Sequence, residues 1–252
     1  MKNNNIFYNK FEVRGFRALD ESRLCDYYLE GHAKVLLDYG IANITSNNRV
    51  WMDNPDIYCL MIQNQDTNEM MGGIRIQLAN GIYPLPVEDA IGYMDNKIYP
   101  IVENYANNGG IGELSALWVD NRLRGLGVGV YLVRAAIASA SQLNFKTMAG
   151  ICGDVTLKMF NDVGFITETS LGNNGQFYYP NDELIAHVVG ILDAISLESA
   201  ADYDKNIMIS FRNNFIQERE ECDTGKRITI AYNLIYPNVV KLVREHQMIE
   251  KK

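Results

Sequence analysis

The segment that most constrains the fold of this chain runs from residue 113 to residue 152. It begins with a nearly continuous apolar run, Glu113–Val119, which is typical of a strand buried on both faces. A short bend with three glycines follows, and apolar residues then recur at helical spacing as far as Gln142. A second apolar strand is expected over Phe145–Cys152. Strand, helix and strand in this order predict a right-handed crossover unit with two parallel neighbouring strands.

The rest of the chain adds both strands and helices to this unit. Two apolar runs with a short polar connection, Ile57–Ile62 and Met70–Leu78, predict an antiparallel pair of strands. Helices are expected over Asp20–Leu37, Val87–Tyr105 and Val155–Val163, and further strands over Gln176–Tyr179, part of Leu184–Leu197 and Arg227–Tyr236. A proline at position 100 should end or kink the second of these helices. The predicted fold class is α/β (α+β), with a mixed, largely antiparallel sheet flanked by helices.

Composition and charge restrict the class of partner. The chain has 252 residues, of which 47% are hydrophobic and 21% charged, as in an ordinary globular protein. Its formal net charge of −8 argues against a nucleic-acid partner. We expect no membrane span, because the longest apolar window, Leu184–Leu197, is shorter than the ~20 residues that a helix needs to cross a bilayer.

The cysteines and the domain organisation complete this outline. Four scattered cysteines without paired spacing favour reduced thiols over disulfides or a metal site, and they suggest a cytoplasmic location. No secretory signal is evident in the first residues. No linker rich in Pro, Gly or Ser interrupts the chain, so residues 1–252 are expected to form one domain. Its core would span about 57–197, with a C-terminal extension, about 198–252, packed on that core.

The glycines at the bend, Gly125, Gly127 and Gly129, point to a phosphate. Glycine costs conformational entropy, and bare backbone at the start of a helix suits the binding of a phosphate group. A P-loop is excluded, since the bend has neither the lysine nor the hydroxyl residue that this motif requires. A dinucleotide-binding loop is excluded as well, because the spacing is GxGxG and no acidic residue follows at the ribose position.

The sequence RLRGLG at residues 122–127 resembles the R/Q-x-x-G-x-G/A signature of the GNAT superfamily of N-acyltransferases, which binds the pyrophosphate of coenzyme A. The resemblance covers about Gly112 to Ile166. It includes the apolar strand that carries Glu113 nine residues before Arg122, the helix after the glycines, and a later Gly164-Phe165 pair.

This resemblance implies a substrate and a set of binding residues. The co-substrate would be acetyl-CoA or another acyl-CoA, with no metal, and the acceptor a small-molecule amine. Two strands of the family's sheet splay apart, so the central strand would bind pantetheine through its backbone as a neighbouring strand would. The two arginines would either contact the pyrophosphate or only flank it. The expected binding residues are Leu117, Trp118, Val119, Arg122, Arg124, Gly125, Leu126, Gly127, Val128 and Gly129.

The expected catalytic residue is Glu113. The family often places a carboxylate on this strand, where it takes a proton from the attacking ammonium directly or through one water. The alternative is a solvated or ion-paired acid at the start of a strand. A backbone N–H of Trp118 or Val119 would polarise the thioester carbonyl.

One departure from the family concerns the general acid. Many members carry a tyrosine four residues before the glycine of Gly-Phe, but this chain has Phe160 there, and Gly153 stands where an asparagine is expected. Three tyrosines are candidate substitutes, although packing roles are favoured for each: Tyr131, Tyr178 and Tyr179.

Several other side chains are weaker candidates. The three histidines lack any ligand spacing and are expected to be ordinary surface or core residues: His32, His187 and His246. Cys152 is a possible acyl carrier, with a buried structural thiol favoured. Arg75, with Arg14 and Arg17, is a possible ligand of an acceptor carboxylate, with surface charge favoured.

The sequence therefore predicts an acyl-CoA-dependent N-acyltransferase and leaves two alternatives open. One is a long-chain enzyme resembling N-acyl amino acid or acyl-homoserine lactone synthases, whose extra length would line an acyl channel. The other is a non-catalytic module that binds acyl-CoA, which Phe160 and Gly153 favour.

Overall fold

The computed structural model describes residues 10–38, 40–41, 48–236 and 239. The strands are β1 (Lys10–Arg17), β2 (Ile57–Asn64), β3 (Met70–Leu78), β4 (Ile111–Val119), β5 (Thr147–Gly153), β6 (Ile166–Thr167), β7 (Gln176–Tyr178), β8 (Ile185–Ile191), β9 (Ile216–Glu221) and β10 (Ile228–Asn233). They form one sheet in the order β6-β8-β5-β4-β3-β2-β1-β10-β9, with β7 paired to β8. Neighbouring strands are antiparallel except for β4 with β5 and β1 with β10.

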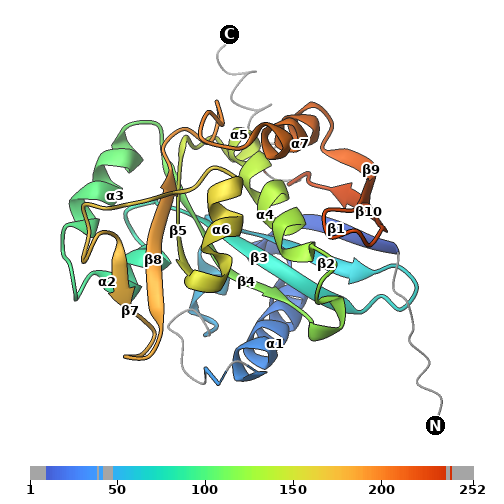
Figure 1. Ribbon diagram of the computed structural model, residues 1–252, viewed down its shortest axis with the longest axis horizontal. Coiled ribbons are helices and arrows are strands. Elements are labelled where there is room, and N and C mark those ends of the chain that lie inside the picture. The colour runs from blue at the N-terminus through green and yellow to red at the C-terminus, as the bar shows by residue number, and fades with distance from the viewer. Residues whose placement is uncertain (1–9, 39, 42–47, 237–238, 240–252) are drawn as a thin grey trace.

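Helices cover both faces of this sheet (Figure 1). They are α1 (Ser22–Asp38), α2 (Pro86–Ile91), α3 (Ile98–Asn107), α4 (Val128–Ala138), α5 (Ala140–Leu143), α6 (Asp154–Asp162) and α7 (Asp202–Asn213), with short 3-10 turns at Ala18–Asp20, Val50–Asp53 and Asn121–Leu123. Apolar side chains of α4, α6 and α7 share one cluster with the facing side of the sheet. Side chains of α1 form a second cluster, and those of α2 and α3 a third, on the opposite face.

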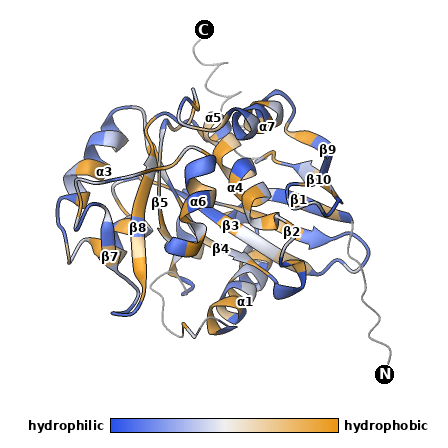
Figure 2. Cartoon of the chain, viewed as in Figure 1, coloured by the Kyte–Doolittle hydropathy of each residue, from blue (hydrophilic) through white to orange (hydrophobic). Residues whose placement is uncertain are grey.

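The helix after the glycine bend is the centre of the larger cluster. Nine residues of α4 are buried, which is typical of a helix that is apolar on all sides. It packs on β2, β3 and β4 and is covered on its outer side by α7. Figure 2 shows α4 and the strands β5 and β8 largely in hydrophobic colours. The buried α4 fixes the position of the bend that precedes it.

The structure confirms the predicted fold class and the crossover unit. Strands β4 and β5 are parallel neighbours joined through α4, and β2 and β3 form the expected antiparallel pair. The first helix starts at Ser22, after a 3-10 turn that ends at Asp20. The predicted strands over 176–179, 184–197 and 227–236 correspond to β7, β8 and β10.

The single helix predicted over Val87–Tyr105 is wrong. The structure has two helices there, since α2 ends at Ile91 with Gly92 as its C-cap, and α3 begins at Ile98. Pro100 lies in the first turn of α3, where a missing N–H breaks no intrahelical hydrogen bond. The proline therefore neither ends nor interrupts the helix that contains it.

Candidate active site

The central feature of the site is the separation of β4 from β5. The two strands pair only over Ile111–Leu114 and Thr147–Gly150, although both continue beyond this register. On its other side β4 carries a bulge: Gly73 pairs with Trp118 and Arg75 with Ser115, and Ala116 between them has a positive φ of 51°. The far half of β4 therefore diverges from β5, as the resemblance to the family implied.

The glycine bend lies at the open end of this separation. Gly125 and Gly127 have φ values of +77° and +78°, which explains the need for glycine at both positions. Within the described residues, no protein acceptor takes the N–H groups of Gly125, Gly127, Val128 or Gly129. These donors lie at the start of α4, where the helix dipole favours an anion. The bend has the hydrogen-bonding capacity that a pyrophosphate requires.

The two arginines of the motif have different surroundings. Arg122 donates to both carboxylate oxygens of Glu69, at 2.9 and 2.7 Å, and to both oxygens of Asp120, at 2.8 Å each. These hydrogen bonds raise the pKa of Arg122 above its ordinary value, Asp120 having the larger effect. Arg124 is exposed and donates to Asn121 Oδ1 at 2.9 Å. The structure thus places the Arg122 guanidinium on two carboxylates of the protein.

The other predicted binding residues differ in what they can offer to a ligand. The side chains of Leu126 and Val128 are buried in the core, so only their backbone groups are available. The side chain of Trp118 is also buried, packed on the ring of Tyr28 in α1. Leu117 and Val119 are half-buried at the diverging end of β4.

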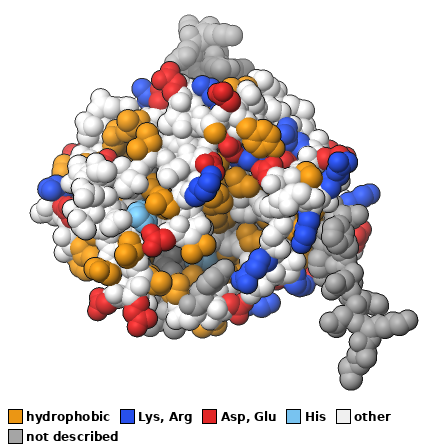
Figure 3. Space-filling view, in the orientation of Figure 1, with side chains coloured by type: hydrophobic (Ala, Val, Ile, Leu, Met, Phe, Trp, Pro, Cys, Tyr) orange, Lys and Arg blue, Asp and Glu red, His pale blue; other side chains and the backbone are white. Residues whose placement is uncertain are grey.

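A cavity of about 250 Å³ opens where β4 and β5 part. Figure 3 shows hydrophobic side chains gathered around the hollow on this face of the molecule. Residues of α1, α2, β4, β5 and α6 contribute to its lining, among them Glu113, Ser115, Leu117, Cys152 and Phe160.

Among the described residues that line this cavity, Glu113 is the only carboxylate, and it is 1% exposed. Its Oε2 accepts a hydrogen bond of 2.8 Å from the backbone N–H of Val87, in the first turn of α2. Burial raises the pKa of Glu113 to about 8, and the bond from Val87 and the charge of Arg75 only partly offset this effect. A carboxyl group with a pKa near neutrality is suited to exchange a proton with an amine.

The structure places the three candidate general acids at different positions relative to the cavity. Tyr179 lines the same cavity as Phe160 and Gly153. Tyr178 is exposed, and the hydroxyl of Tyr131 accepts the backbone N–H of Asp223 at 3.1 Å on the far side of α4. Of the three predicted tyrosines, only Tyr179 is next to the position where the family has its tyrosine.

The structure also gives the surroundings of two of the weaker candidates, Cys152 and His187. Burial, with a further contribution from Asp154, raises the pKa of Cys152 to about 12, which argues against a thiolate nucleophile. His187 contacts Asp154 Oδ1 at 2.6 Å through Nε2. His246 lies outside the described residues.

His32 is a residue that the sequence analysis undervalued. It is buried on α1 and lines the cavity that contains Glu113. Burial, with a contribution from Arg75, lowers the pKa of His32 to about 4, so its ring is neutral at physiological pH. Its spacing from Cys25 and Tyr28 on the buried face of α1 was the available signal.

The three arginines grouped by the sequence analysis do not act together. Arg14 is half-exposed and pairs with Glu21 at 2.5 Å, and Arg17 donates to the carbonyl of Pro55 at 2.6 Å. Arg75, in contrast, is 2% exposed. Surface charge, the favoured interpretation for Arg75, is therefore wrong: its side chain is covered by Trp51, whose ring lies 4.9 Å from the guanidinium carbon.

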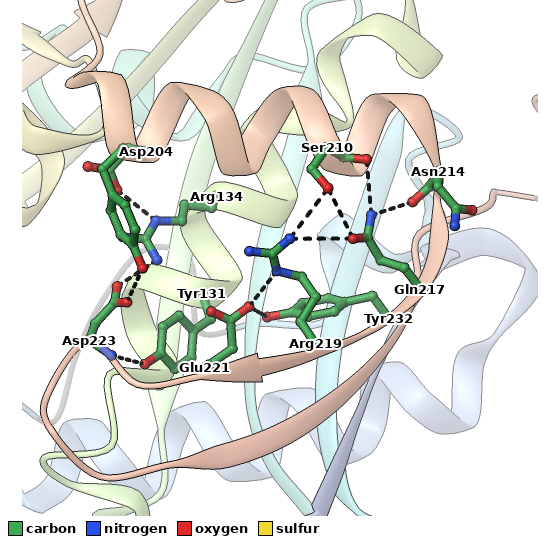
Figure 4. Close-up of polar contacts among 11 residues, drawn as sticks. Tyr131, Arg134, Asp204, Ser210, Asn214, Gln217, Arg219, Glu221, Asp223 and Tyr232 are labelled. Carbon is green, nitrogen blue, oxygen red and sulfur yellow. Dashed lines mark hydrogen bonds and ion pairs between the residues drawn. The ribbon is translucent and has the colours of Figure 1, made fainter.

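A buried polar network supports the glycine bend from the C-terminal part of the chain (Figure 4). Arg134 of α4 pairs with Asp204 of α7 at 2.7 Å and with Asp223, in the turn between β9 and β10, at 2.6 Å. The bond from Asp223 to Tyr131 lies beside the bend, since a side chain at Gly127 would approach the Tyr131 hydroxyl to 2.8 Å. The network links α7 and the β9–β10 turn to the helix that carries the bend.

Two negative findings concern the described part of the chain. It contains no cluster of three or more His, Cys, Asp or Glu side chains that could hold a metal ion. None of its helices combines the length and the apolar character that crossing a bilayer requires.

Three features together define the GNAT fold class. They are this strand order, the divergence of β4 from β5, and a bend rich in backbone N–H groups before α4. The family model of the acetyltransferase (GNAT) family matches residues 19–165, which is more than half of the chain. The protein therefore belongs to the GNAT family, whose members transfer acyl groups from acyl-CoA.

Solved structures of the same fold agree with this assignment. FeeM, an N-acyl amino acid synthase from uncultured soil microbes, is 12% identical with a TM-score of 0.59, covering 79% of this chain and 98% of FeeM. The acyl-homoserine lactone synthase LasI is 15% identical with a TM-score of 0.51, covering 77% and 97%. BjaI, a CoA-dependent acyl-homoserine lactone synthase, is 12% identical with a TM-score of 0.50, covering 80% and 89%. Comparison with curated protein sequences gave no match.

Proposed function

We propose that this protein is an acyl-CoA-dependent N-acyltransferase that acts on a small-molecule amine. The observation that carries the proposal is the position of a buried carboxyl group, Glu113, in the cavity between β4 and β5. The nearby bend has N–H groups that no acceptor among the described residues takes. One end of this arrangement suits the pyrophosphate of the donor, and the other end suits the amine of the acceptor.

The bend holds the donor in this proposal. The N–H groups of Gly125, Gly127, Val128 and Gly129 bind the pyrophosphate, with main-chain contributions around Arg124 and Leu126. Arg122 keeps the bend in place through Asp120 and Glu69 and is not a direct ligand. Strand β5 does not pair with β4 beyond Leu114, so the backbone of Leu117, Trp118 and Val119 binds pantetheine there as it would bind a neighbouring strand.

The chemical step uses Glu113 as the base. Its carboxylate takes a proton from the ammonium group of the acceptor, and the free amine attacks the thioester carbon. A backbone N–H of Trp118 or Val119 stabilises the oxyanion, the carbon–sulfur bond breaks, and Tyr179 donates a proton to the departing thiolate. The reaction needs no metal, and we place it in the cytoplasm, in keeping with the free cysteines.

The length of the acyl chain divides this proposal into two versions. Acetyl transfer is the simpler one. Transfer of a long acyl chain is favoured by the similarity to FeeM, LasI and BjaI, which extends over more than three quarters of this chain. A series of acyl-CoAs of increasing length, assayed by thiol release with an amine panel, separates these versions from each other and from a module that only binds acyl-CoA.

The donor site is best tested at Gly129. A Cβ at this position would meet Met159 Sδ at 3.8 Å and Leu117 Cδ2 at 4.0 Å, which are ordinary contacts, so a side chain fits there. In Gly129→Glu a carboxylate in the first turn of α4 suits the helix dipole but repels a pyrophosphate. Calorimetry should show an affinity for CoA lower by about 10²-fold.

The matched control is Gly129→Gln, which has the same size without the charge and should retain most of the affinity that Gly129→Glu loses. Substitution at Gly127 is less informative, because its positive φ and the Tyr131 hydroxyl would strain the fold itself. Equal CoA affinity of Gly129→Glu and the wild type would place the pyrophosphate elsewhere.

A further inference from the structure

The side chain of Arg75 is a buried cation that the proposed reaction does not use. It extends from β3, is 2% exposed, and lines a cavity of about 250 Å³ together with Trp51, Gln77 and Asp89. Its Nε donates to Ser115 Oγ at 3.1 Å. Its Nη1 is buried and has no hydrogen-bond partner within the described residues. The guanidinium group therefore has unused hydrogen-bonding capacity, and its residue lines this cavity.

No carboxylate of the described residues forms an ion pair with Arg75, and Glu113 acts on it only as a more distant charge. Neither of the nearby acids, Glu113 and Asp89, lies within ion-pair distance of it. The guanidinium group donates to the hydroxyl of Ser115 and stacks on the face of the Trp51 ring. A buried charge without a partner is costly, and proteins seldom retain one unless a ligand supplies the counter-charge.

The strand register relates Arg75 to the proposed base. Arg75 is opposite Ser115 and Gln77 is opposite Glu113, so Arg75 and Glu113 are diagonal neighbours on one face of the β3–β4 pair. Diagonal positions on paired strands are roughly 7–8 Å apart. A small molecule that carries two polar groups can contact both side chains over this distance. Pro86 lines both cavities, which places the two groups at adjoining sites.

We propose that Arg75 binds the carboxylate of the acceptor, so that the acceptor is an amino acid. This inference rests on the proposed N-acyltransferase function and specifies its substrate class. The carboxylate pairs with the guanidinium group of Arg75, and the amino group of the same molecule lies at Glu113.

The charge of the site favours a carboxylate over a phosphate. Arg75 supplies one positive charge, and one carboxylate neutralises it with charge-assisted hydrogen bonds to a planar group. A phosphate monoester carries close to two negative charges and would leave one of them uncompensated near Asp89 and Glu113.

The test compares each amino acid with its own amide, which keeps the side chain and the amine but removes the negative charge. Thiol release is measured for both series with acetyl-CoA and with a long-chain acyl-CoA, on the full chain. The wild type should prefer acids over amides in kcat/KM by about 10²-fold for the best acceptor. Arg75→Met should abolish this preference while its affinity for CoA, measured by calorimetry, stays unchanged.

Two variants accompany Arg75→Met. Arg75→Lys keeps the charge but loses the planar group, and its preference for acids should be intermediate. Arg23→Met removes an exposed arginine from α1 and should behave as the wild type. If Arg75→Met does not fold, Arg75→Lys and the acid-to-amide ratio of the wild type decide the question.

The proposal is overturned if the wild type uses acids and amides equally, or if Arg75→Met keeps the preference. If no amine is acylated at all, the proposed function fails, and binding then tests Arg75 separately. Calorimetry with the amino acids in the presence of CoA should show saturable binding to the wild type and none to Arg75→Met. Absence of binding to the wild type would reject the carboxylate site.

Discussion

Two buried arginines of this protein have opposite surroundings. Arg134 is 4% exposed, and two carboxylates contact it, Asp204 at 2.7 Å and Asp223 at 2.6 Å. Burial alone would lower the pKa of Arg134, but these carboxylates outweigh it and raise the pKa above the ordinary value. Arg75 is similarly buried, but no carboxylate in the described part of the chain contacts it, and burial lowers its pKa.

The difference separates a structural region from a reactive one. The charge of Arg134 is paired with two carboxylates of the protein, and these ion pairs join α4 to α7 and to the β9–β10 turn (Figure 4). The face of β3 and β4 that carries Arg75 and Glu113 is different, because both groups are buried and neither forms an ion pair with another described residue. Satisfied buried charges hold a fold together, whereas unsatisfied ones in a cavity indicate a binding or catalytic role.

The largest effect is expected for the carboxyl group on the β3–β4 face. Glu113→Gln keeps an oxygen for the N–H of Val87 but removes the base. A general base contributes typically ~10²–10⁴-fold, so kcat should fall by that order with little change in CoA affinity. The loss should shrink at high pH, where more of the acceptor amine is already deprotonated.

Steady-state kinetics between pH 6 and pH 10 measure this effect. A variant with nearly wild-type kcat at neutral pH would assign Glu113 to the capping of α2 alone. Proton removal would then belong to water or to another group.

The next largest effect concerns stability and the ion pairs of Arg134. Arg134→Met leaves Asp204 and Asp223 without their buried partner, which should lower the free energy of unfolding by about 3–5 kcal/mol. Urea unfolding measures the loss. In the double variant Arg134→Met with Asp204→Asn, one orphaned charge is removed and part of the stability should return. A loss below about 1 kcal/mol in the single variant would show that these ion pairs are not what holds α4 and α7 together.

The crossover unit and the bend were predictable from sequence because their signals are local. The apolar strand, the glycines and the helical stripe all lie within about forty residues, and only glycine suits the positive φ of Gly127. By contrast, β1 pairs with β2 and β10, which are distant in the chain, and its sequence KFEVRGFR carries four charges. The edge strand β9, IQEREE, is mostly charged, as edge strands often are, and gave no strand signal.

The two halves of the candidate site were predictable to different degrees. The bend carries a spaced motif, but the acceptor side depends on which elements cover β3 and β4. That Arg75 is buried follows from contacts with Ser115 and Trp51, forty and twenty-four positions away in the chain, and no local pattern reports them. The sequence motif did not indicate the partners of its first arginine: the side chain of Arg122 donates to carboxylates of the protein itself. The division into a core and a C-terminal extension stays a prediction.

An effect of similar size, spread over several pH units, is expected in the pH dependence of stability. The pKa of Glu113 is about 8 in the folded protein, above its ordinary value of 4.5, so the folded state holds this proton more tightly than the unfolded state. The stability that this proton contributes is complete below about pH 4.5 and is lost as the pH rises through about 8. Glu113→Gln lacks this dependence.

The wild type should therefore lose stability relative to Glu113→Gln by about 1.4 kcal/mol per pH unit between about pH 5 and pH 8. Urea unfolding of both proteins at a series of pH values measures the difference. Parallel curves would mean that Glu113 is ionised in the folded state, and that the β3–β4 face differs less from the surroundings of Arg134 than its contacts indicate.

The smallest effect is expected for the free energy of unfolding of Arg75→Met, in contrast to the large loss expected for Arg134→Met. Arg75→Met removes a buried charge that no carboxylate in the described part of the chain contacts, together with one hydrogen bond to Ser115 and the stacking on Trp51. Relief of the desolvation cost offsets those lost contacts, so the free energy of unfolding should change by no more than about 1 kcal/mol. The measurement belongs at about pH 6, where Glu113 is protonated and does not attract Arg75. A loss of about 3 kcal/mol or more, equal to that of Arg134→Met, would mean that Arg75 has a partner within the protein. The contrast between the two arginines, and with it the case for a ligand carboxylate, would then be lost.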